Sequence, residues 1–220
     1  FRRRCCSGLE AGRRRESRLM QDFEILSATV IDREIRGESS VFITVFSENC
    51  GFVQMMKRTS AKKTSQIPDL FDDISAFARA DTPGSLKFMR DFEVLRHREG
   101  IAASYETFEA ASNLAGCTAK NGRHIEDCGL FSRRLKRALD ALSVGMPPPI
   151  VEIKFLYLLA RDEGYAVRED FYAGLASDKK RIFSDILKMP PAELGELRQR
   201  AYGLLEQLRV WICANTDLML

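Results

Sequence analysis

The stretch that decides the fold reads ATVIDREIRGESSVFITVFSENCGFVQMMKR, residues 28–58. Its apolar residues recur with a period of two and are rich in β-branched and aromatic types, which is typical of β-strands. Two turns interrupt the alternation. The first, at residues 36–40, contains a glycine, and the second, at residues 48–51, reads as a tight hairpin. The stretch therefore predicts three consecutive strands joined by short turns.

The same alternation continues on both sides of this stretch. A turn signal at residues 81–85, Asp-Thr-Pro-Gly-Ser, separates the last two candidate strands. Five strands within about 75 residues, with short connections, favour a small barrel, for which the five-stranded OB-fold is the candidate. The expected strands are 24–35, 41–47, 52–58, 70–80 and 86–96.

Beyond Gly100 the apolar period changes to that of a helix. Helices are expected over residues 102–119, 127–143, 150–163, 177–188 and 191–214. The predicted fold class is therefore α+β, an N-terminal five-stranded OB-fold β-barrel followed by an all-helical domain. We expect a basic, disordered tail over 1–22, the OB-fold domain over 23–98 and the helical domain over 99–220.

The second strand is apolar on both faces. Val41, Ile43 and Val45 point one way, and Phe42 and Phe46 point the other. Something must therefore cover the outer face of the barrel here. Two interpretations stay open: packing against the helical domain, or a platform on which nucleic-acid bases stack.

The net charge of +3 comes from the N-terminal tail. Residues 1–19 carry seven arginines and two glutamates, so the rest of the chain has a net charge of −2. A case for nucleic acid must therefore rest on local patches. The tail is interpreted as a disordered extension or as the result of a start set upstream of Met20.

Cysteine usage and hydropathy favour a cytoplasmic protein. The six cysteines lack the dense, even spacing of a secreted disulfide framework, which suits a reducing compartment. No apolar run approaches the roughly 18 residues of a membrane-spanning helix, so we expect no membrane association.

Catalytic motifs are sparse. The sequence has two histidines, and it contains no G-x-S-x-G, no phosphate-binding glycine loop ending in Lys-Ser or Lys-Thr, and no H-E-x-x-H. Asp69, Asp72 and Asp73 could together hold a magnesium ion, as in a metal-dependent nuclease, but they lack a further acidic partner at a recognisable metal-binding spacing. We therefore expect no enzyme activity and no cofactor.

A zinc site is also not expected. Cys117, His124 and Cys128 are spread over twelve residues. Zinc prefers four ligands offered as close pairs such as C-x-x-C, and no pair or fourth ligand is present here. The cysteines are interpreted as small buried hydrophobic residues.

Basic clusters supply the candidate binding residues. One cluster occupies residues 57–63 at the end of the third strand, and another lies on the polar face of the helix over 127–143. Cations mixed with hydroxyls on flexible backbone suit phosphate binding, although a solvated face is the alternative interpretation of either cluster. The candidate nucleic-acid-binding residues are Arg36, Lys57, Arg58, Lys62, Lys63, Arg133, Arg134 and Arg137.

Residues 28–40, 43–51 and 57–63 together resemble the N-terminal domain of the RecO family of bacterial recombination mediators. The shared pattern is a strand, a Gly-Glu-Ser-Ser turn, a strand ending in Phe-Ser, a glycine hairpin and a basic loop. A looser match covers residues 152–165, which resemble the central helix of the family and its Gly-Tyr end. The four-cysteine zinc module of many RecO proteins is missing, because no cysteine lies between Cys128 and Cys213. The C-terminal end also lacks the basic residues of the family.

The resemblance implies a protein that binds single- and double-stranded DNA, anneals complementary strands and helps to load the RecA recombinase in DNA repair. It implies RecR and single-stranded DNA-binding protein as partners, and a place at the nucleoid in the bacterial cytoplasm. The alternative is a divergent protein-interaction scaffold of the same fold that has lost DNA binding.

Overall fold

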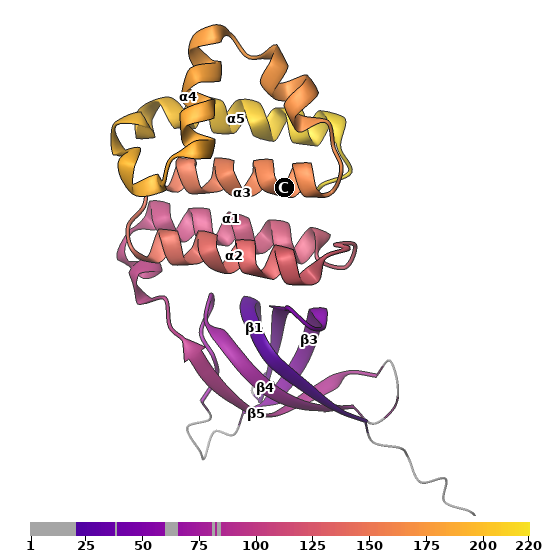
Figure 1. Cartoon of the computed structure of the whole chain (residues 1–220). Coiled ribbons are helices and arrows are strands. Elements are labelled where there is room, and N and C mark those ends of the chain that lie inside the picture. Colours follow the sequence, from indigo (N-terminus) through magenta and orange to yellow (C-terminus); the bar gives the residue numbers. More distant parts are fainter. Residues whose placement is uncertain (1–20, 38, 60–65, 81, 83–84) are drawn as a thin grey trace, which may run out of the picture.

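The computed structural model describes residues 21–220 apart from 38, 60–65, 81 and 83–84 (Figure 1). Most of the expected basic tail, and both Lys62 and Lys63, lie outside the described residues. The described part is a five-stranded sheet followed by helices, which confirms the predicted α+β class.

All five predicted strands are present, with ends that differ by a few residues. They are β1 (Gln21–Arg36), β2 (Ser40–Ser47), β3 (Gly51–Arg58), β4 (Asp73–Ala80) and β5 (Lys87–Arg96). Strand β4 starts three residues later than expected because the chain turns before it: Phe71 has a φ of 69°, and the Asp72 carboxylate accepts a hydrogen bond from the Asp69 N–H at 2.9 Å.

The strands close into a barrel in the order β1-β2-β3-β5-β4. The long strand β1 closes it, because its first half pairs antiparallel with β4 and its second half pairs antiparallel with β2. Strands β3 and β5 run parallel. Alternate residues point inward and form an apolar barrel core that includes Ile25, Val30, Ile43, Val45, Met55 and Ile74.

The helical part begins directly after β5. Its α-helices are α1 (Tyr105–Asn121), α2 (Cys128–Ser143), α3 (Pro148–Asp162), α4 (Ser177–Lys188) and α5 (Arg198–Asn215). Shorter turns are η1 (Glu99–Ala103), the π-helical η2 (Val167–Tyr172), η3 (Pro191–Glu193) and η4 (Gly195–Leu197).

Two helices begin later than expected. Helix α1 starts at Tyr105 because Ser104 is its N-cap, and the Ser104 hydroxyl accepts a hydrogen bond from the Thr107 N–H. The helix expected from residue 191 begins with two 3₁₀ turns, so that α5 proper starts at Arg198.

The helices stack in layers on one end of the barrel (Figure 1). Helices α1 and α2 lie next to β1 and β2, α3 lies over them, and α4 and α5 cover α3. Helix α3 is buried on almost every side, as its apolar sequence indicates. The helical core also includes Ile31, Phe46 and Phe71 from the barrel, so the barrel and the helices share one apolar interface. Among the described residues, no helix has the length and apolar character needed to span a bilayer.

Candidate nucleic-acid interface

An apolar strip runs across the outer face of three neighbouring strands. In the sheet register Phe42 on β2 lies opposite Met56 on β3, and Met56 lies opposite Phe88 on β5. All three side chains are half-buried. The residues that flank Phe42, Val41 and Ile43, are buried inside the barrel, which places Phe42 on the outside.

Two arginines lie over the two rings of this strip. The Arg36 guanidinium is 4.5 Å from the centroid of the Phe42 ring, and the Arg58 guanidinium is 5.9 Å from that of Phe88. Arg36 also forms an ion pair with Glu34 at 2.7 Å, and both side chains remain more than half exposed. We call Arg36, Phe42, Met56, Arg58 and Phe88 the cation–aromatic surface.

Lys57 does not belong to this surface, although it is adjacent to Arg58 in sequence. Successive strand residues point to opposite faces. Lys57 is two residues after the inward-pointing Met55, so it lies on the same face as Met55 and on the face opposite to Arg58. Its ammonium lies 4.5 Å from the centroid of Phe92, a residue packed against the barrel core. Burial lowers the pKa of Lys57, and the charge of Asp91 partly opposes this shift.

The other end of β2 packs against the helices. The Phe46 ring is fully buried and contacts Phe131 of α2 edge to face, with 4.9 Å between ring centroids. Packing against the helical part therefore covers only one of the two outward-facing phenylalanines of β2. Phe46 belongs to the interface with the helices, and Phe42 stays on the surface beneath Arg36.

The arginines of the basic cluster on α2 also differ in whether their charges are exposed or paired within the chain. Arg134 pairs with Asp162 and donates a hydrogen bond to the Leu158 carbonyl, so its charge is used within the helical part. Arg133 and Arg137 are exposed and form no ion pair with any residue in the described part of the chain.

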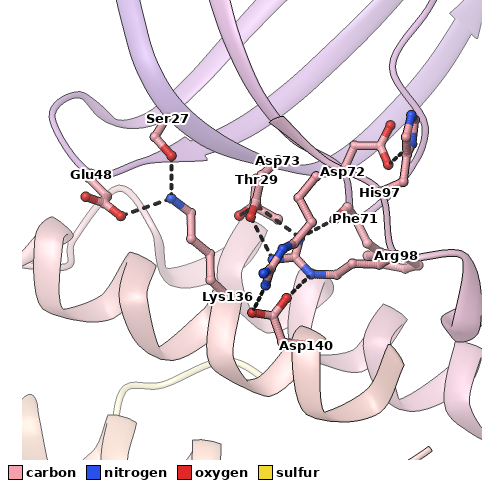
Figure 2. Close-up of polar contacts among 11 residues, drawn as sticks. Ser27, Thr29, Glu48, Phe71, Asp72, Asp73, His97, Arg98, Lys136 and Asp140 are labelled. Atoms are coloured by element: carbon pink, nitrogen blue, oxygen red, sulfur yellow. Dashed lines mark hydrogen bonds and ion pairs between the residues drawn. The ribbon is translucent and has the colours of Figure 1, made fainter. Parts of the chain in front are cut away.

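The fourth cation of the α2 cluster crosses to the barrel. The Lys136 ammonium lies 2.6 Å from the Ser27 hydroxyl and 2.9 Å from a Glu48 carboxylate oxygen (Figure 2). Its side chain is 15% exposed, so it ties α2 to β1 and to the β2–β3 hairpin instead of presenting its charge to a phosphate.

The main polar link between the barrel and the helices is a buried arginine (Figure 2). The Arg98 side chain is 1% exposed and forms ion pairs at 2.7 Å with Asp73 of β4 and with Asp140 of α2. Thr29 of β1 donates a further hydrogen bond to Asp73 at 2.6 Å. Burial alone would lower the pKa of Arg98, but hydrogen bonds and charges from both carboxylates outweigh it and raise that pKa.

Asp69 and Asp72, the other two acids considered for a metal site, also have partners within the chain. Asp69 pairs with Arg33 at 2.8 Å, and the buried Asp72 carboxylate lies 3.0 Å from Nδ1 of His97. Asp69, Asp72 and Asp73 therefore bind three different cationic or imidazole partners. Within the described ranges, no group of three His, Cys, Asp or Glu side chains could hold a metal ion.

The cysteines of the region considered for zinc have separate surroundings. Cys117 is buried in α1, and burial raises its pKa to about 12. Cys128 at the start of α2 lies beside Gly51, where an added Cβ would come within 2.9 Å of its sulfur. His124 is exposed.

The structure brings only part of the predicted site together. Arg36 and Arg58 share the cation–aromatic surface, Lys57 faces another way, and the α2 arginines lie on the helical part. Sequence reasoning missed Met56, which lies opposite Phe42 in the β2–β3 pairing, and Phe88, which joins the site only through the pairing of β3 with β5. A scan against protein-family models and a search of curated proteins find no match to this chain.

Proposed function

We propose that this chain binds single- and double-stranded DNA, anneals complementary strands and assists recombinase loading in DNA repair. The observation that carries the proposal is the cation–aromatic surface, where two exposed arginines lie over half-exposed phenylalanine rings on β2 and β5, the two strands that flank β3. The proposal rests on the chemistry of that surface and on the resemblance to RecO.

Such a surface suits single-stranded nucleic acid. Each base has a π-face that stacks on an aromatic side chain whatever its sequence, and arginine contributes both cation–π contacts and phosphate binding. Phe42 and Phe88 are separated by Met56, so the strip spans three strands of the barrel. A strand of DNA lying along it would meet a cation next to each ring. Recognition of this kind is independent of sequence, which is what annealing requires.

The closed strand order supports the proposal that the barrel is an OB-fold. The order β1-β2-β3-β5-β4, with β3 and β5 parallel and β1 paired on both sides, is compatible with the five-stranded Greek-key barrel of that fold. OB-folds bind oligonucleotides on the face of their second and third strands. Phe42, Met56 and Arg58 belong to these two strands.

The proposal has further parts that follow from the resemblance to RecO: membership of that family, no enzyme activity, RecR and single-stranded DNA-binding protein as partners, and a place at the bacterial nucleoid. The helical part would then carry protein contacts, and Arg98 and Lys136 would hold it rigidly to the DNA-binding barrel.

An annealing assay with two complementary fluorescent oligonucleotides, with and without single-stranded DNA-binding protein, tests the function directly. Arg36→Ala/Arg58→Ala should slow annealing and weaken binding. The slope of log affinity against log salt should flatten by about 0.7–0.9 for each phosphate that the variant no longer neutralises. The matched control is Arg133→Ala/Arg137→Ala, which removes the same charge from exposed positions of α2.

Two results would redirect the proposal. If the α2 variant loses binding and the barrel variant does not, the helical part holds the DNA. If the wild-type chain binds no DNA even at low salt, the scaffold alternative replaces the mediator. Two observations favour that alternative: Arg36 is already paired with Glu34, and Lys57 is already half-buried over Phe92.

A further inference from the structure

The barrel has a second exposed aromatic side chain, Phe77, on the outer face of β4. A groove of about 280 Å³ runs over β4 and its two neighbours, β1 and β5. Phe77 of β4 lines it and is 39% exposed, and Leu26 of β1 is 62% exposed. Neither β2 nor β3 contributes to this groove, so it is separate from the cation–aromatic surface.

Carboxylates flank the Phe77 ring on both sides. The sheet register places Glu24 of β1 and Asp91 of β5 directly opposite Phe77, and it places Glu93 opposite Ser75. Directly opposed residues have their Cβ atoms about 4.5–5.5 Å apart, so the ring lies between two acids. Glu24, Asp91 and Glu93 all line the groove, and no lysine or arginine does.

The other barrel rings with exposed edges are covered by cations of the chain itself. Arg36, Lys57, Arg58, Lys87 and Arg123 lie 4.5–5.9 Å from the centroids of five phenylalanine rings, those of Phe42, Phe92, Phe88, Phe23 and Phe52. Phe77 differs from these five, because no cation from the described part of the chain lies over its ring. Its two flanking carboxylates likewise form no ion pair within the described ranges.

We propose that this groove docks a basic segment of a partner protein, with an arginine or lysine side chain over Phe77 between Glu24 and Asp91. The ring face attracts a cation, and the two carboxylates pair with it. An apolar residue of the same segment packs on Leu26. We name this surface, defined by Glu24, Leu26, Phe77, Asp91 and Glu93, the acidic groove.

Charge decides between a protein and a nucleic acid as the occupant. Three carboxylates repel a phosphate backbone, whereas they complement a lysine- or arginine-containing segment. The segment cannot add a strand to the sheet, because the barrel is closed and β4 is paired on both sides. Side chains alone therefore give the affinity, and the proposal goes beyond DNA binding by assigning this face to a protein contact.

The test uses the full chain and a fluorescein-labelled peptide in which arginine alternates with leucine. Fluorescence anisotropy measures its affinity. Phe77→Leu keeps an apolar side chain but removes the aromatic face, and should weaken binding about two- to fivefold. Glu24→Gln/Asp91→Asn removes the carboxylate charges and should weaken it by at least as much at low salt. The matched control, Glu169→Gln/Glu196→Gln, makes the same charge change at exposed positions of the helical part.

Amide chemical shifts of the ¹⁵N-labelled protein then locate the contact. We expect the peptide to perturb residues of β1, β4 and β5 around Phe77. Wild-type affinity of the Phe77→Leu variant, equal weakening in the control variant, or shifts confined to the helices would overturn the proposal. Shifts of the same amides caused by an oligonucleotide and not by the peptide would assign the face to nucleic acid. Shifts that depend on protein concentration without any peptide would assign it to a second copy of the chain.

Discussion

Replacing Arg98 with methionine should destabilise the protein more than any other single charge removal at the junction of barrel and helices. The guanidinium is the shared partner of two carboxylates, Asp73 and Asp140, which come from the barrel and from α2 respectively. Methionine has a similar apolar stem but cannot donate a hydrogen bond. The variant would therefore leave the Asp73 carboxylate buried, with Thr29 as its remaining described hydrogen-bond donor.

The expected magnitude follows from burial. Removing one partner of a buried ion pair costs about 3–5 kcal/mol, because the other charge stays desolvated and unpaired. Total stabilities of such proteins are about 5–15 kcal/mol, so the loss is a large part of the whole. Arg96 provides the matched control, because it pairs with the same Asp140 while its side chain is 56% exposed. Arg96→Met should cost only about 0–1 kcal/mol.

Urea unfolding followed by two probes measures both the loss and its location. The single tryptophan, Trp211 in α5, reports on the helical part, and far-UV circular dichroism reports on the whole chain. The two curves should coincide in the wild type and separate in Arg98→Met, because the main polar link between barrel and helices is removed. A loss no larger than that of Arg96→Met would refute the reasoning. Adding Asp73→Asn to Arg98→Met should recover part of the stability, since it removes the stranded charge.

Three further outcomes are expected. Gly51→Ala should lower the free energy of unfolding more than Gly37→Ala: both glycines have positive φ, so each change costs about 1–2 kcal/mol of strain, but only the Cβ at Gly51 meets the Cys128 sulfur. In the Gly51→Ala background, Cys128→Ala should remove this extra loss. Equal destabilisation by Gly51→Ala and Gly37→Ala in urea melts would contradict the prediction. Burial raises the pKa of Glu152 in the folded protein despite its pairing with Arg209. Protonated Glu152 therefore contributes stability that is fully present below the ordinary glutamate pKa and is lost as pH rises through the pKa of the folded state. The stability of Glu152→Gln relative to wild type should therefore increase from acidic toward neutral pH, and a pH-independent difference would be inconsistent with that shift. DNA affinity of the wild type should fall steeply with salt and depend little on base sequence, as titrations of unrelated oligonucleotides at several ionic strengths would show.

The strands and helices could be predicted because their patterns are local. Alternating apolar residues predicted each strand, and the change to a helical period predicted where the sheet ends. The start of β4 was wrong by three residues because a long-range contact fixes the preceding turn. The Arg98 guanidinium donates to the Phe71 carbonyl from 27 residues away in sequence, and no local pattern carries that information.

The candidate site was predictable only where neighbours in sequence are neighbours in space. Lys57 and Arg58 read as one cluster, yet strand alternation sends them to opposite faces, a distinction that the pattern itself already contained. The pairing of Arg58 with Phe88 depends on β3 meeting β5, and this parallel contact has no signature in either strand. His97 is largely exposed, but one of its ring nitrogens lies next to the buried carboxylate of Asp72, which is 25 residues away in sequence.

The parallel contact between β3 and β5 also has a mechanical consequence. Within the described residues the two strands pair only at Met55–Lys87 and Met56–Phe88, whereas β2 and β3 pair along their whole length. The barrel therefore has a seam, and its short ladder is where local opening needs the fewest broken hydrogen bonds. Amide exchange should be fastest along this seam. Met56 and Phe88 lie on it, so a ligand that contacts both side chains would hold the two strands together and slow that exchange.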